Sequence, residues 1–163
     1  SIKKDVSDLI KICHSPTNRY YKGSEDIIKV CNELDQKGVI KFSLIEGKSQ
    51  NEVIKLKKGC DVYIDQIHNR GGWGYGMSSV EALSMGLVCM TELVPKYQKF
   101  LPDHPFINID KNSLREKLIY LSQNKDVVTQ KKDESKKWVK KYHDISSVSD
   151  SLYRFYEDKS WIK

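Results

Sequence analysis

Residues 62–90 read VYIDQIHNRGGWGYGMSSVEALSMGLVCM, and the order of apolar and polar segments in this stretch decides the fold. A short apolar run at residues 62–64 is followed by a polar loop in which four glycines occur within six residues. A helical segment then leads to Gly86, and a second apolar run follows at residues 87–90. A strand, a helix and a second strand in this order are typical of a parallel βαβ unit.

The same alternation extends in both directions along the chain. Five short β-rich apolar runs lie at residues 9–13, 39–45, 62–64, 87–90 and 106–109. Between them, apolar side chains recur at helical spacing, at Ile27, Ile28, Cys31 and Leu34 and again at Leu114, Leu118 and Leu121. We therefore expect an α/β fold in which helices cover a parallel sheet of about five to six strands.

After residue 111 the sequence contains only helical patterns, at residues 113–124, 127–142 and 147–158. These helices are interpreted either as a cap on the sheet or as a strap toward another domain. We expect residues 1–163 to form a single domain, with residues from about 143 to 163 as a C-terminal helical extension. Because the chain opens almost directly into the first strand, we also expect it to be the later half of a larger protein.

Local signals mark where the helices begin and end. Two pairs of residues fit the capping box, in which each side chain satisfies a free backbone N–H: Ser49 with Glu52, and Ser113 with Glu116. Three glycines directly before strands are expected to end helices in the left-handed conformation: Gly38, Gly59 and Gly86.

Length and composition restrict the class of protein. At 163 residues, of which 39% are hydrophobic, the chain has the size of one ordinary domain. No apolar run approaches the roughly 18 residues of a membrane-spanning helix, and no stretch resembles a signal peptide, so we expect a cytoplasmic protein. The histidines never occur at the i,i+4 spacing of a helical metal site, and no metal is expected. Buried free thiols are expected at the widely spaced Cys13, Cys31, Cys60 and Cys89.

The formal net charge of +6 is compatible with nucleic acid, a phosphorylated ligand or an acidic membrane surface as partner. Much of the excess charge lies in six lysines between residues 131 and 141, interleaved with Asp133 and Glu134. This pattern favours a solvated helix face, and weak peripheral contact with the inner membrane face is the alternative. No aromatic and basic binding motif accompanies the lysines, so no nucleic-acid partner is expected.

Residues 14–23, HSPTNRYYKG, follow the first expected strand. In open parallel α/β sheets, ligands bind beyond the carboxyl ends of the strands, which is where this loop lies. Arg19 is suited to hold a diphosphate by bidentate hydrogen bonds, and Lys22 by its point charge. The alternative interpretation is a solvated turn with two surface cations.

The glycine-rich loop allows the backbone to approach a ligand closely, and the helix after it presents free N–H groups at the positive end of its dipole. This helix start is therefore a candidate diphosphate site. Glu81 lies a little over one turn into the helix. Removing a carboxylate from water there costs free energy unless it has a partner, such as a pair of ribose hydroxyls. An exposed helix glutamate is the alternative.

Residues 76–89, GMSSVEALSMGLVC, closely match the run G-x-x-x-x-E-A-(small or apolar)-x-x-G-x-P-V, and the chain therefore resembles the C-terminal domain of retaining glycosyltransferases of family 4. The first loop is similar to that family's phosphate-binding loop, especially in members that read H-x-P-T-N-R-x-x-K-G. The resemblance extends from about residue 9 to about residue 125. It implies a Rossmann-like three-layer domain that forms one half of a GT-B fold, together with a missing N-terminal acceptor domain.

The resemblance also implies a function for individual residues. Arg19 and Lys22 would bind the diphosphate of a nucleoside-diphosphate sugar, and Glu81 would bind the ribose hydroxyls. The remaining donor-contacting positions would be Ser15, Thr17, Glu46, Gly47, Trp73, Gly76, Met77 and Ser78. Within this set, backbone N–H groups of residues 76–78 would lie near the phosphates, and residues 46–47 near the nucleobase. Such enzymes transfer a hexose with retention and need neither metal nor cofactor, because the protein itself stabilises the departing diphosphate.

Two departures from the family pattern concern the donor sugar and the helix end. The family carries a second glutamate eight positions before the one matched by Glu81, and here Trp73 takes that place. Trp73 could stack on a base or sugar, or pack the loop. The proline that commonly follows the helix is replaced by Leu87 and Val88.

Two other functions compete with this hypothesis. A flavodoxin-like receiver would use Asp65 as phospho-acceptor, but it needs acidic residues after the first strand, and none are present there. A non-catalytic nucleotide-binding or scaffolding module is the second alternative, which the tryptophan at position 73 keeps open. Under the favoured hypothesis the chain alone binds a nucleotide sugar weakly and is inactive, because the acceptor site lies on the missing domain.

Overall fold

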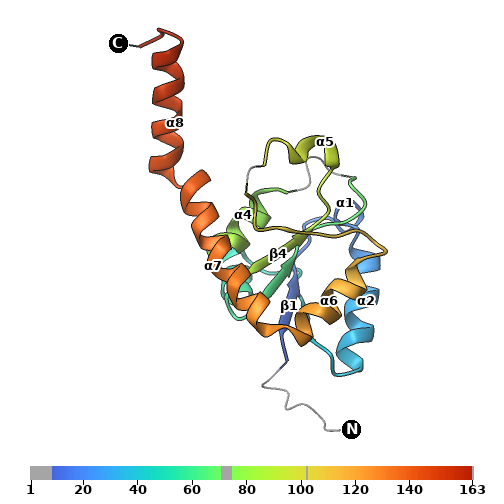
Figure 1. Ribbon diagram of the computed structural model, residues 1–163. Helices are drawn as coiled ribbons and strands as arrows, with labels where there is room; N and C mark the ends of the chain where they lie inside the picture. Colours follow the sequence, from blue (N-terminus) through green and yellow to red (C-terminus); the bar gives the residue numbers. More distant parts are fainter. Residues whose placement is uncertain (1–8, 71–74, 102, 163) are drawn as a thin grey trace.

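The computed structural model describes residues 9–70, 75–101 and 103–162. Its five strands form one parallel sheet with the order β2-β1-β3-β4-β5 (Figure 1). The strands are β1 (Lys11–His14), β2 (Lys41–Leu44), β3 (Val62–Ile64), β4 (Val88–Thr91) and β5 (Ile107–Asn108). All five expected strands are present; β3 has the expected bounds, and the other four differ slightly from their apolar runs.

Eight helices accompany the sheet in the described residues: α1 (Arg19–Lys22), α2 (Ser24–Gln36), α3 (Gln50–Lys58), α4 (Met77–Ser84), α5 (Pro95–Gln98), α6 (Leu114–Gln123), α7 (Lys125–Tyr142) and α8 (Ile145–Asp158). Successive strand residues point to opposite faces, so each face of the sheet has its own core. Ile12 and Ile64 pack with α2 and α6 on one face, whereas Tyr63 and Cys89 pack with α4 and α7 on the other. The expected three-layer α/β architecture is confirmed.

The strand order places a topological switch between β1 and β3. β1 is paired to β2 on one side and to β3 on the other. The helix that follows β1 packs on one face of the sheet, and α4, which follows β3, packs on the opposite face. The connections therefore diverge at the carboxyl ends of these two strands, and such a divergence opens the crevice in which α/β proteins bind ligands.

Of the five expected helix signals, three are confirmed and two are wrong. Ser49 and Glu52 form the capping box of α3. Ser113 does not form one, because the carboxylate of Asp110 accepts the backbone N–H groups of Asn112 and Ser113 and also the Ser113 hydroxyl. Gly38 and Gly86 have φ of 66° and 78°, as expected, but Gly59 ends α3 in a right-handed conformation with φ of −81°.

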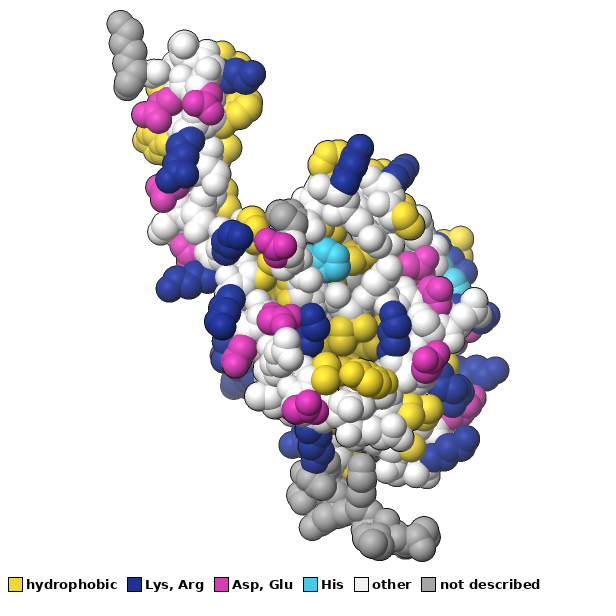
Figure 2. Space-filling view, in the orientation of Figure 1, with side chains coloured by type: hydrophobic (Ala, Val, Ile, Leu, Met, Phe, Trp, Pro, Cys, Tyr) yellow, Lys and Arg dark blue, Asp and Glu magenta, His cyan; other side chains and the backbone are white. Residues whose placement is uncertain are grey.

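The sequence leaves two interpretations of the C-terminal helices open, a cap on the sheet or a strap toward another domain. α7 packs on α4 and β4, so it caps the sheet. α8 contains no buried residue and extends away from the sheet (Figure 1). It carries six large exposed apolar side chains, Ile145, Val148, Leu152, Tyr153, Phe155 and Tyr156. Figure 2 shows apolar side chains gathered along this helix. Among the described helices, none is both long and apolar enough to cross a bilayer.

The basic segment of α7 is partly neutralised within the chain. Lys132 forms an ion pair of 2.5 Å with Asp61, and Lys131 forms one of 2.6 Å with Glu134. Figure 2 shows further basic side chains along α7. The arrangement agrees with a largely solvated helix face.

All four cysteines are free thiols. Three of them, Cys13, Cys31 and Cys89, are buried as expected, whereas Cys60 is only half-buried at the end of α3. Burial raises the pKa of Cys31 to about 12 and also raises that of Cys89. These two thiols therefore stay protonated at neutral pH and behave as small apolar core residues.

His14 connects β1 to β3 and α2 from a fully buried position. Its Nδ1 lies 2.8 Å from the Ile64 carbonyl oxygen, which only accepts, so Nδ1 carries the proton and donates. Its Nε2 accepts from the Ser24 hydroxyl at 2.8 Å. The neutral ring thus has both nitrogens satisfied, and burial lowers the pKa of His14 to about 4.

This buried histidine predicts acid-sensitive stability. Below pH 6.5 the unfolded chain binds a proton at His14 that the folded protein binds only near pH 4, so the free energy of unfolding should fall by about 3 kcal/mol between these values. Urea titrations of the wild type and His14→Gln between pH 7 and pH 4 measure the effect. The variant should lose less stability over that interval, since every other titrating group is common to both proteins. Equal losses would contradict the prediction.

Candidate functional site

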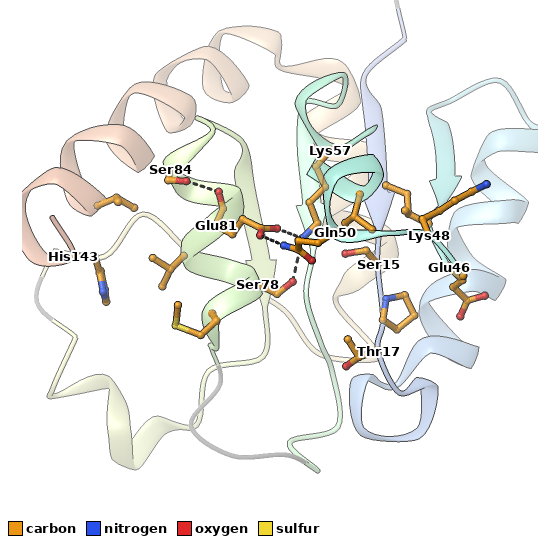
Figure 3. A pocket seen from close by; sticks show the side chains of 17 residues that line it. Ser15, Thr17, Glu46, Lys48, Gln50, Lys57, Ser78, Glu81, Ser84 and His143 are labelled. Carbon is orange, nitrogen blue, oxygen red and sulfur yellow. Dashed lines mark hydrogen bonds and ion pairs between the residues drawn. The ribbon is translucent and has the colours of Figure 1, made fainter. Parts of the chain in front are cut away.

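A cavity of about 800 Å³ lies at the carboxyl edge of the sheet beside the switch between β1 and β3. One wall is formed by the loops after β1 and β2, at residues 15–17 and 45–48, and the other by the inner faces of α3 and α4. Figure 3 shows Ser15, Thr17 and Glu46 on one side and Glu81 on the other, with Gln50 and Lys57 between them. A cavity of this size can hold a ligand as large as a nucleotide.

Seven of the residues selected from the sequence line this cavity: Ser15, Thr17, Glu46, Gly47, Met77, Ser78 and Glu81. Gly76 lines a smaller adjoining pocket together with Tyr75 and His143. Arg19 and Lys22 are not among the lining residues of the large cavity, and Trp73 lies outside the described residues. The fold thus brings most of the predicted positions together but gives the two cations other partners.

Arg19 is engaged by a carboxylate of the neighbouring loop. Its Nε and Nη2 donate to the two carboxylate oxygens of Glu46 at 2.8 and 2.6 Å, in a bidentate pair, and Nη1 lies 3.4 Å from Glu25. The pair raises the pKa of Arg19 and lowers that of Glu46. Because Glu46 lines the cavity, its carboxylate links Arg19 to the rim, and the guanidinium side chain is 47% exposed.

Lys22 points toward the start of α4. Its Nζ lies 2.5 Å from Oδ1 of the fully buried Asp65 and donates to Gln66 at 3.3 Å. The other oxygen of Asp65 accepts from the Ser79 hydroxyl at 2.5 Å. One carboxylate therefore joins Lys22 to the first turn of the helix that carries Glu81.

The start of α4 has the properties of an anion-binding helix end. Gly76 is its N-cap and provides no side-chain cap, and Met77 and Ser78, the first helical residues, line the cavity. The first N–H groups of a helix have no partner within the helix and lie at the positive end of its dipole. The Ser78 hydroxyl lies 2.9 Å from the Tyr63 hydroxyl, and the Ser15 hydroxyl donates to the same phenol at 3.4 Å. This chain of hydroxyls connects the two walls.

Glu81 is not an exposed helix glutamate. Its Oε1 forms a 2.8 Å ion pair with Lys57, and its Oε2 accepts from the Gln50 side-chain amide at 2.6 Å. The side chain is 25% exposed and borders the cavity (Figure 3). The carboxylate is therefore held in a fixed orientation before any ligand binds.

Sequence reasoning missed Lys57 and Gln50. The side chain of Lys57 is 1% exposed, and its Nζ contacts Glu81, the Ser78 hydroxyl and the ring of Tyr63. The one sequence feature that could have indicated Lys57 is its i,i+4 spacing from Val53, which places both side chains on the inward face of α3. Within the described residues, no group of three or more His, Cys, Asp or Glu side chains is arranged to hold a metal ion.

Comparisons with known proteins identify the fold. No protein-family model matches the chain, and no curated protein matches it in sequence. Among solved structures, a variant of S. aureus TarM in complex with fondaparinux, α-GlcNAc-glycerol and UDP superposes with a TM-score of 0.67 at 11% identity, over 90% of this chain and 35% of that one. WaaG, a glycosyltransferase involved in lipopolysaccharide biosynthesis, superposes with a TM-score of 0.63 at 14% identity, over 89% of this chain and 46% of that one.

The chain has the Rossmann-like fold of one half of a GT-B structure. It spans less than half the length of either neighbour. At these identities the likeness establishes the fold, and the function has to be argued from the site itself.

Proposed function

We propose that the chain is the donor-binding half of a retaining glycosyltransferase and that its cavity binds a nucleoside-diphosphate sugar. The observation that carries the proposal is the position of Glu81, whose carboxylate borders the cavity about one turn from the uncapped start of α4. A carboxylate beside an anion-binding helix end suits a ligand that carries both hydroxyls and phosphates. The resemblance in sequence and the presence of UDP in the TarM complex support the same class of ligand.

Each group of residues has a distinct function in this proposal. Glu81 accepts hydrogen bonds from the ribose hydroxyls, and the backbone N–H groups of Met77 and Ser78 bind the phosphates. Residues 46–47 border the position of the nucleobase. Lys22 neutralises the buried carboxylate of Asp65 behind the start of α4, so that no unpaired negative charge opposes a bound phosphate there.

Arg19 reaches the diphosphate from the cavity rim. Its guanidinium is partly exposed and bound to a carboxylate, so a diphosphate oxygen can replace Glu46 as its bidentate partner. The positive groups then stabilise the charge that develops on the departing diphosphate, which is the largest catalytic contribution that such a site can make without a metal. The acceptor would bind on a second domain, so residues 1–163 alone should bind the donor without transferring the sugar.

Calorimetric titration of the chain with UDP, GDP and ADP tests the proposal. We expect one of the three to bind, and Glu81→Ala to weaken that binding about 10- to 100-fold, because hydrogen bonds to a charged group contribute about 1.5–3 kcal/mol. Glu116→Ala, on the exposed side of α6, is the matched control and should bind like the wild type. No binding to any of the three at millimolar concentration, or equal binding by Glu81→Ala, would contradict the proposal.

The two alternatives can be separated by further observations. A receiver is disfavoured because Asp65 is fully buried and bonded to Lys22 and Ser79, where a phosphoryl donor cannot reach it. A non-catalytic nucleotide-binding module is favoured only by the tryptophan at position 73. Donor binding by the full-length protein without any sugar transfer would support that alternative.

A further inference from the structure

Lys57 occupies a position that lysine rarely takes. Its side chain is 1% exposed on the inner face of α3, and fully buried lysines are uncommon because removing the ammonium from water is costly. Its three contacts lie at the cavity: the Glu81 carboxylate at 2.8 Å, the Ser78 hydroxyl at 3.1 Å and the ring of Tyr63 at 4.4 Å from its centroid. Two of these contacts are made to residues that line the proposed donor site (Figure 3).

The carboxylate of Glu81 receives one bond on each oxygen from α3. Lys57 donates to Oε1, and Gln50, one residue after the Ser49 cap, donates to Oε2 at 2.6 Å. A carboxylate oxygen has two lone-pair positions, so each oxygen keeps one acceptor position after these bonds. Since Glu81 borders the cavity, two acceptors about 2.2 Å apart on one rigid group are available to a ligand.

We infer that Lys57 and Gln50 are positioning residues that fix the Glu81 carboxylate for bidentate recognition of a vicinal diol, the ribose 2′- and 3′-hydroxyls of the donor. This inference rests on the proposed function. Two neighbouring hydroxyls each donate one hydrogen bond, which matches the two remaining acceptor positions. Lys57 also binds Ser78 at the start of α4, so the same ammonium aligns the diol-binding group with the first turn of the phosphate-binding helix.

A purely structural function for Lys57 explains its position less well. A buried ion pair usually adds little stability over apolar side chains of similar volume, so burial of an ammonium is not needed to pack α3 against the sheet. The aliphatic part of the chain would pack equally well as methionine. The ammonium is required only to hold the carboxylate and the hydroxyl that face the cavity.

The affinity ratio between a nucleoside diphosphate and its 2′-deoxy counterpart tests the inference. Calorimetry with whichever of UDP, GDP or ADP binds best, and with the matching 2′-deoxynucleotide, should give a preference for ribose of about tenfold or more in the wild type. Lys57→Met should reduce that preference to about threefold or less. Gln50→Ala, an exposed substitution that does not disturb the core, should reduce it in the same direction. Lys58→Met removes the same charge from the exposed neighbouring position and should keep the wild-type ratio.

The outcomes distinguish this inference from the proposed function. If the wild type prefers ribose and both Lys57→Met and Gln50→Ala keep that preference, the positioning function is wrong while the donor site stands. If the wild type binds none of the three nucleotides, the proposed function fails and the inference fails with it. In the background of Glu81→Gln, Lys57→Met should have no further effect on the ratio, because Lys57 acts through Glu81. A further loss there would overturn the inference.

Discussion

Lys22→Met is expected to lower the free energy of unfolding by about 3–5 kcal/mol, because it leaves a buried carboxylate without its ion-pair partner. Asp65 is 0% exposed, and its Oδ1 lies 2.5 Å from the Lys22 ammonium. The Ser79 hydroxyl on Oδ2 and the Tyr63 hydroxyl 3.5 Å from Oδ1 would remain as partners, but neither carries a positive charge. Urea denaturation at pH 7, followed by circular dichroism, measures the loss.

A matched control and a second variant make this prediction specific. Lys29→Met removes a lysine from the exposed face of α2 and should change stability by no more than about 0.5 kcal/mol. Adding Asp65→Asn to Lys22→Met should restore part of the lost stability, since the unpaired charge is then gone. The prediction would be contradicted if Lys22→Met lowered the free energy of unfolding by less than about 1 kcal/mol, or if the double variant recovered no stability. The ion pair would then not hold the segment after β1 to the end of β3.

Gly23→Ala is expected to destabilise the fold by about 3 kcal/mol or more, through both backbone strain and steric overlap. Gly23 has φ of 64°, and a Cβ at this position would lie 2.6 Å from Ile67 Cγ1, 2.7 Å from the Ile67 carbonyl oxygen and 2.8 Å from His68 Cδ2. The carbonyl oxygen belongs to the backbone that leads from β3 into the glycine-rich loop, so relief would require the two loops to separate. Thermal and urea denaturation should both report the loss.

Gly38→Ala supplies the matched control for this steric argument. Gly38 has nearly the same conformation, with φ of 66°, but no atom lies within 4 Å of the position that a Cβ would occupy there. Its substitution should therefore lose only the conformational part, about 1–2 kcal/mol. Equal losses at both glycines would mean that contact between the first loop and Ile67 contributes nothing.

The sheet was predictable because its signals are local. Short β-rich runs separated by helical periodicity located all five strands, and Leu114, Leu118 and Leu121 identified the buried face of α6. Errors occurred where one residue had two competing partners. Ser113 fits a capping box by spacing, but Asp110, three residues earlier, already accepts both the Ser113 N–H and the Ser113 hydroxyl.

The candidate site was predictable only in part, because the identity of each partner depends on the tertiary fold. The positions at the carboxyl ends of the strands could be selected because parallel strands bring such loops to one edge. The sequence does not show that Arg19 binds Glu46, 27 residues away, or that Lys57 binds Glu81, 24 residues away. A lysine in a helix rich in lysine has the same local pattern whether it is solvated or buried, and only the packing of α3 against the sheet places Lys57 inside.

The most direct measurement of the proposed donor site is the change in backbone amide chemical shifts of the chain during titration with UDP, GDP and ADP. If the cavity binds the nucleotide, the largest shifts should occur at Ser15, Gly47, Met77 and Ser78, which line it from both walls. Amides in the second half of α8, which extends away from the sheet (Figure 1), should not change. The absence of shifts at millimolar nucleotide, or shifts confined to residues outside the cavity, would contradict the proposal that this face of the sheet binds a nucleoside diphosphate.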